Sequence, residues 1–117
     1  MFHKTRVVVV GAKNPANILE QHSDIYDVCY MCDHIEWRTY LEKLHLAEKL
    51  ASEADIVIVY PTLGELEIFL LGIAYSKHTA LIYGIDVQKG TESLYHRTFR
   101  DMGEYSLWVG GYEISGN

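Results

Sequence analysis

Cysteine is scarce in this chain, because Cys29 and Cys32 are the only two among 117 residues. A small secreted domain held together by disulfides carries more cysteines, so we expect a reduced, cytoplasmic setting. The single C-x-x-C pair, followed by Asp33 and His34, has no second pair to complete a zinc site, and its segment is interpreted as the end of a buried strand. We therefore predict no metal site and no cofactor.

Positive charge is also in short supply, since 10 lysines and arginines face 16 aspartates and glutamates, for a net charge of −6. A protein that binds the nucleic-acid backbone needs a basic surface, so nucleic acid is not an expected partner. No apolar run is long enough to cross a bilayer, and the start "MFHKTRVVVVGAKN" lacks a signal-peptide cleavage site. We expect no membrane association, and the length predicts a single domain over residues 1–117.

Apolar strand segments alternate with helical segments along the whole chain. Strands are predicted at Arg6–Val10, Ile25–Met31, Asp55–Pro61, Thr79–Gly84 and Tyr105–Gly110. Helices are predicted from an N-cap at Asn14, over Glu36–Ala54, from about Gly64 to Lys77, and over Thr91–Met102. Because the strands are continuous apolar runs, they indicate a parallel sheet covered on both faces. The prediction is a flavodoxin-like or Rossmann-like three-layer α/β sandwich with strand order 2-1-3-4-5.

A sheet of this order predicts where a ligand binds. The site lies outside the carboxyl ends of the strands where the order reverses, here between the first and third strands. The flanking loops are "GAKNP" and "YPTLGE", which contain neither a dinucleotide glycine fingerprint nor a Walker loop. The candidate ligand-binding residues are Gly11, Ala12, Lys13, Asn14, Tyr60, Thr62 and Gly64.

The stretch "ADIVIVYPTLGELEIFLLGIAYSKHTALIYG", from Ala54 to Gly84, resembles the central part of the nucleoside 2-deoxyribosyltransferase-like superfamily. That group includes nucleoside deoxyribosyltransferases and nucleoside 5′-monophosphate N-glycosidases. The match is carried by "LLGIA" (70–74), then Lys77 and the strand from Thr79, about a quarter of the chain in all. The resemblance implies a carboxylate that attacks the sugar C1′ and forms a covalent intermediate, which water or a second base resolves.

The chain departs from the family at the residue that matters most. The family's catalytic glutamate falls two residues before the glycine, where this chain has Leu70. Glu67 lies one helical turn earlier, so we assign catalysis to Glu67, helped by Glu65 or Asp86. Each of these carboxylates has an alternative interpretation. Glu65 forms a capping box with Thr62, and Glu67 lies at a solvated rim. Asp86 either binds a ribose hydroxyl or is an ordinary aspartate of a surface loop.

Two further interpretations concern binding. Lys13 and Asn14 either hold phosphate at the start of the first helix or are a solvated lysine and an N-cap. Trp37 and Arg38 either stack on a base and pair with an anion, or Trp37 belongs to a helix core face.

The helix expected from about Gly64 to Lys77 is apolar on nearly every side, which predicts a second copy of the chain against its outer face. The family resemblance also implies a homo-oligomer, in which a neighbour's C-terminus helps to close each site. The expected ligand is a nucleoside or nucleotide. The expected function is cleavage or transfer at its N-glycosidic bond; the alternatives are an inactive protein that sequesters or senses a nucleotide or an NAD-derived signal, and a structural subunit with an empty crevice.

Overall fold

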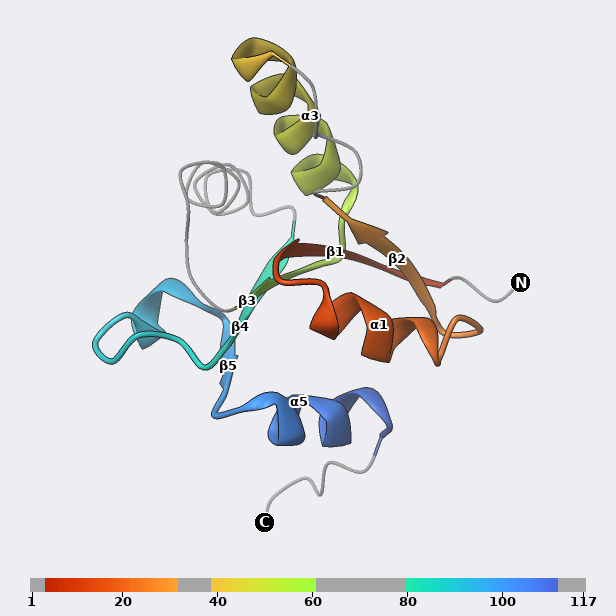
Figure 1. Ribbon diagram of the computed structural model, residues 1–117, viewed down its shortest axis with the longest axis vertical. Helices are drawn as coiled ribbons and strands as arrows, with labels where there is room; N and C mark the ends of the chain where they lie inside the picture. The colour runs from red at the N-terminus through yellow and green to blue at the C-terminus, as the bar shows by residue number, and fades with distance from the viewer. Residues whose placement is uncertain (1–3, 32–38, 61–79, 112–117) are drawn as a thin grey trace.

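A five-stranded parallel sheet organises the described part of the protein. The computed structural model describes residues 4–31, 39–60 and 80–111 (Figure 1). Its strands are β1 (Thr5–Gly11), β2 (Tyr26–Tyr30), β3 (Ile56–Tyr60), β4 (Leu81–Ile85) and β5 (Arg97–Phe99). They are hydrogen-bonded in the order β2-β1-β3-β4-β5, and every pair is parallel. The predicted flavodoxin-like order is therefore confirmed.

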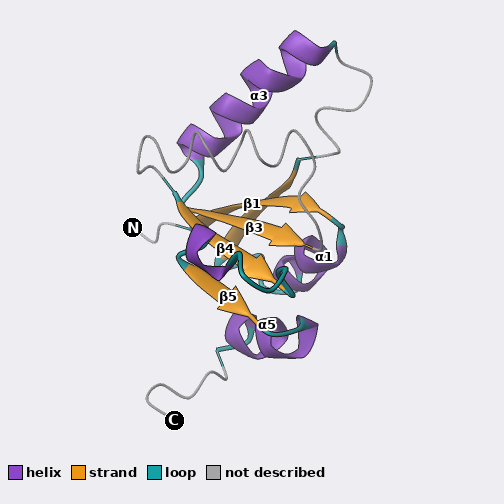
Figure 2. Cartoon of the chain, turned by 90° about the vertical axis from the view of Figure 1, so that its left-hand side faces the viewer, coloured by secondary structure: helices purple, strands orange, loops and turns teal. Residues whose placement is uncertain are grey.

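Helices cover both faces of this sheet. They are α1 (Asn14–Glu20), α3 (Tyr40–Glu53) and α5 (Met102–Val109), with a short 3-10 turn, η1, at Glu92–Leu94. Figures 1 and 2 show α1 and α5 on one side of the strands and α3 on the other. No helix in the described ranges is both long enough and apolar enough to pass through a membrane.

Residues 7–10 of β1 and residues 56–59 of β3 are all apolar because both faces of these segments are buried. Val8, Val10, Val57 and Val59 pack in one core cluster with alanines of α3. The intervening residues pack in a second cluster with α1 and α5; they are Val7, Val9, Ile56 and Ile58. This alternation explains the continuous apolar runs that identified the strands in the sequence.

An aromatic cluster fixes α5 against the sheet. The Phe99 ring lies 6.0, 5.5 and 5.4 Å, centroid to centroid, from the rings of Tyr83, Tyr105 and Trp108. The Tyr105 hydroxyl donates a 2.9 Å hydrogen bond to the carbonyl oxygen of Pro15, which joins α5 to α1. Burial, with a smaller contribution from Tyr26, raises the pKa of Tyr105, so this hydroxyl stays protonated and can donate.

The last third of the chain differs from the sequence-based expectation. The helix predicted over Thr91–Met102 is instead η1 followed by β5, and the strand predicted over Tyr105–Gly110 is the helix α5. The reason is a cap: the Asp101 side chain accepts a 2.9 Å hydrogen bond from the backbone N–H of Glu104 and starts a helix. The apolar side chains that follow then meet the core at helical spacing; they are Met102, Tyr105, Trp108 and Val109.

Three further details concern the helices: one prediction is corrected, one cap is identified, and one predicted helix falls outside the described residues. Asn14 is not the N-cap of α1; Lys13 occupies that position without a side-chain cap bond, and Asn14 is the first helical residue. The α3 helix is capped by Thr39, whose hydroxyl accepts from the N–H of Glu42 at 3.3 Å. The helix predicted from about Gly64 to Lys77 lies outside the described residues.

Candidate functional site

The order of strands reverses between β1 and β3, at the carboxyl ends of both. Gly11 is the last residue of β1 and Tyr60 the last of β3, and the two are register partners. From β1 the chain continues to β2 on one side, while β3 and β4 extend the sheet on the other (Figure 1). The order of strands therefore reverses at the ends of β1 and β3, and ligands bind outside the carboxyl ends of strands at such a reversal in open α/β sheets.

The turn after β1 is held by both neighbouring strands. Gly11 has a φ of 97°, a conformation that favours glycine, and the chain bends there toward α1. The backbone N–H of Ala12 donates to the carbonyl oxygen of Tyr60 on β3 at 2.6 Å. On the other side, the hydroxyl of Tyr30 on β2 donates to the carbonyl oxygen of Gly11, also at 2.6 Å. The turn is thus fixed by one hydrogen bond from each side.

Lys13 places a positive charge next to the turn after β1. Its side chain is exposed, and its Nζ lies 5.9 Å from the centroid of the Tyr30 ring. The sequence reasoning selected Gly11, Ala12 and Lys13, and the structure brings them together at the end of β1. It did not select Tyr30, although the position of this tyrosine at the end of the strand beside β1 places it at the same edge of the sheet.

Asp86 follows the last residue of β4 at the same edge of the sheet. It is exposed, and its φ of 51° places it in the left-handed region, where aspartate is one of the few residue types found at moderate cost. Its backbone N–H donates to the carbonyl oxygen of Phe99 at 2.9 Å, so the end of β5 fixes this conformation. The Asp86 carboxylate is therefore available to a ligand at the carboxyl edge.

The remaining candidates cannot be placed against these residues. Thr62, Gly64, Glu65 and Glu67 lie outside the described residues, as does Leu70. The same holds for Trp37, Arg38 and Cys32. The capping box and the catalytic assignments therefore remain predictions from the sequence.

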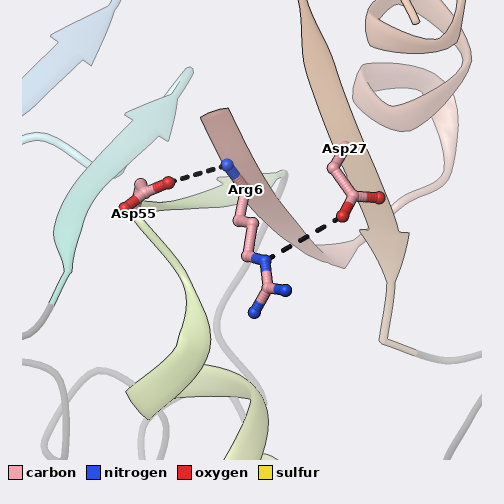
Figure 3. Close-up of polar contacts among 3 residues, drawn as sticks. All are labelled: Arg6, Asp27 and Asp55. Atoms are coloured by element: carbon pink, nitrogen blue, oxygen red, sulfur yellow. Dashed lines mark hydrogen bonds and ion pairs between the residues drawn. The ribbon is translucent and has the colours of Figure 1, made fainter. Parts of the chain in front are cut away.

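A cavity of ≈ 230 Å³ lies at the opposite, amino edge of the strands. Its lining residues in the described ranges are Arg6, Val7, Val8, Asp27, Cys29, Leu50, Glu53 and Ala54. Figure 3 shows Arg6 between two aspartates: its backbone N–H donates to Asp55 Oδ2 at 2.8 Å, and its Nε lies 4.0 Å from Asp27 Oδ2. The side chains of Arg6 and Asp27 are 54% and 64% exposed, so this contact is a solvated surface ion pair.

We favour the carboxyl edge as the functional site. The amino edge has a cavity, but ligands of open α/β sheets bind at the carboxyl ends of the strands, and among the described residues the bent turn at Gly11 lies at that carboxyl edge. Cys29 is half-buried and packs against the core beside α3. Among the described residues, no three histidine, cysteine or acidic side chains gather closely enough to hold a metal ion.

Comparison of the chain with models of known protein families gives no match, and neither does comparison with curated proteins. The function is therefore argued from the geometry of the carboxyl edge and from the sequence of residues 54–84.

Proposed function

We propose that the protein binds a nucleoside or nucleotide at the carboxyl edge between β1 and β3 and acts on its N-glycosidic bond. The observation that carries this proposal is the reversal of strand order at Gly11 and Tyr60, where hydrogen bonds from both sides fix the turn. A fixed turn can contact a ligand without paying the entropy of ordering a loop. The chemistry is supplied by the sequence resemblance between Ala54 and Gly84.

The proposed reaction needs a nucleophile and a proton donor. The Glu67 carboxylate attacks C1′ of the sugar, the C1′–N bond breaks, and its electron pair passes to the base nitrogen, which takes up a proton as the base leaves. Water then attacks C1′, releases the carboxylate and gives up a proton. Glu65 or Asp86 serves as the acid and base for these proton transfers. A second base in place of water gives transfer instead of hydrolysis.

A second function is binding without turnover. Leucine stands at position 70, where the resembled family has its catalytic glutamate, and leucine has no group that can attack C1′. If no glutamate at position 70 is present and Glu67 does not attack the sugar, the turn after β1 and Asp86 serve only to bind a nucleotide, which the protein then sequesters or senses.

One experiment separates these functions. The protein is incubated with a panel of ribo- and deoxyribonucleosides and their monophosphates, and released base is measured by chromatography. We expect base release from at least one compound and a loss of at least 100-fold in Glu67→Gln, because the amide is neither a nucleophile nor a base. Glu20→Gln, an exposed carboxylate in the last turn of α1, is the matched control and should keep full activity.

Activity that persists in Glu67→Gln contradicts the assigned role of Glu67. A rise in melting temperature with a nucleotide, without any released base, supports binding without turnover, because a ligand that binds the native state stabilises it. If no compound is cleaved and none raises the melting temperature, both functions are wrong.

A further inference from the structure

One side chain, Tyr30, contacts both chemically distinct parts of the turn after β1. Its hydroxyl donates to the Gly11 carbonyl oxygen at 2.6 Å, and its ring lies 5.9 Å from the Lys13 ammonium. Tyr30 is the last residue of β2, and β2 pairs with β1 through the register partners Val9 and Tyr30. Its backbone is therefore fixed by the sheet, and its side chain is half-buried.

The hydroxyl contact controls the backbone of the turn. At Gly11 the backbone enters a conformation with φ of 97°, and the next residue, Ala12, bonds to β3 through its N–H. Without the Tyr30 hydroxyl, the hydrogen bonds given above for the described residues hold the turn from the β3 side. A glycine turn has many accessible conformations, so the loss of this hydrogen bond lets the turn move.

The ring contact controls the position of the charge. A lysine side chain on the surface samples many rotamers, and attraction to an aromatic face limits them. The protein carries a net charge of −6, so its overall field repels an anionic ligand. A cation held beside the strand reversal gives local attraction that a neutral ligand does not receive.

We infer that Tyr30 is a positioning residue: its hydroxyl sets the turn at Gly11, and its ring sets the Lys13 ammonium, so that the site prefers a phosphorylated nucleoside to the unphosphorylated one. This inference rests on the proposed function, because it concerns ligand binding at the same edge. It assigns different consequences to the two parts of one side chain. Loss of the hydroxyl changes the affinities for the nucleoside and its monophosphate by the same factor, whereas loss of the ring changes the ratio of the two affinities.

The test measures dissociation constants by calorimetry for a nucleoside and its monophosphate, using the pair that the wild type binds best. Wild type should bind the monophosphate at least tenfold more tightly, and added salt should reduce that ratio. Tyr30→Phe keeps the ring, so it should weaken the binding of both ligands three- to tenfold. The ratio of the two dissociation constants should stay the same. Tyr30→Leu removes the ring as well, and the ratio should fall at least threefold; Lys13→Gln should bring it close to one.

Tyr83→Phe is the matched control, because Tyr83 is a half-buried tyrosine in the aromatic cluster on the α5 side of the sheet. It should bind both ligands as wild type does. Melting temperatures show whether each variant folds, and if Tyr30→Leu does not, Tyr30→Phe decides the inference. Wild-type affinities in Tyr30→Phe, an unchanged ratio in a folded Tyr30→Leu, or equal binding of both ligands by wild type overturns it. If wild type binds neither ligand, the proposed function itself has failed.

Discussion

Replacing Phe99 by alanine is expected to lower the free energy of unfolding by about 4 kcal/mol, within the range found for large aromatic truncations in protein cores. Phe99 is 1% exposed and belongs to the core cluster between the sheet and the helices α1 and α5. Its ring lies near three other aromatic rings, so truncation leaves a cavity and also removes edge-to-face contacts. Urea unfolding followed by circular dichroism measures the change.

The matched control for Phe99 is Leu107→Ala on α5. Leu107 is 54% exposed, so its truncation should change the free energy of unfolding by less than about 0.5 kcal/mol. We expect a large effect of Phe99 because β5 has only three residues and is an edge strand, so its attachment to the core depends on this buried side chain. A loss of less than about 1 kcal/mol in Phe99→Ala would mean that β5 and α5 are not packed as described.

Replacing Gly84 by alanine should lower the free energy of unfolding by about 2 kcal/mol, because it overpacks a tight site. Gly84 is in β4, paired with Val59 on one side and Thr98 on the other. A methyl group there overlaps Val87 Cγ1 and comes within 2.8 Å of Tyr95 Cε1. The Tyr95 ring, which packs against the core on the α3 side, has to move away from the strand.

Gly103→Ala provides the comparison for Gly84. Gly103 is exposed in the first turn of α5, and a methyl group there meets Asp101 Oδ1 at 3.3 Å, a tight approach at the edge of solvent. Alanine favours helix over glycine by about 1 kcal/mol, which offsets this approach, so no net loss of stability is expected. Equal melting temperatures for Gly84→Ala and wild type would contradict the packing of Tyr95 over β4.

The topology could be predicted because it depends on local patterns that the chain displays strongly. The runs Val7–Val10 and Ile56–Val59 are buried on both faces, and such runs occur in central parallel strands. The connections between successive predicted strands are long enough to hold the helical crossovers that parallel strands need, which limits the strand order to a few possibilities. The first three strands and the α3 helix were therefore found close to their observed positions.

The end of the chain was misread because two signals compete there. Leu107, Trp108 and Val109 form an apolar run that is typical of a strand, yet the Asp101 cap and the spacing from Met102 to Val109 favour a helix. In the folded protein, the Tyr105 hydroxyl reaches Pro15 and the ring of Trp108 joins the aromatic cluster, so tertiary contacts support the helix. The strand β5 is short, and its polar positions Arg97 and Thr98 gave no strand signal.

The candidate site was predicted in part. Gly11, Ala12 and Lys13 follow from the topological rule, because the rule names the loop at the carboxyl end of β1. The role proposed for Tyr30 depends on a hydrogen bond between residues 19 positions apart in the chain, which no local pattern contains. Likewise, the conformation of Asp86 is set by its bond to Phe99 on β5, a strand that the sequence reasoning placed elsewhere.

Nuclear magnetic resonance titration with a nucleoside monophosphate tests most directly whether the carboxyl edge binds the ligand. The backbone amide signals of the ¹⁵N-labelled protein are followed as ligand is added. We predict the largest shifts at residues 11–14 and at Asp86, with Arg6, Asp27 and Ala54 at the amino-edge cavity unchanged. Shifts concentrated around Arg6 and Asp27 instead, with none at residues 11–14, would contradict the assignment of the site.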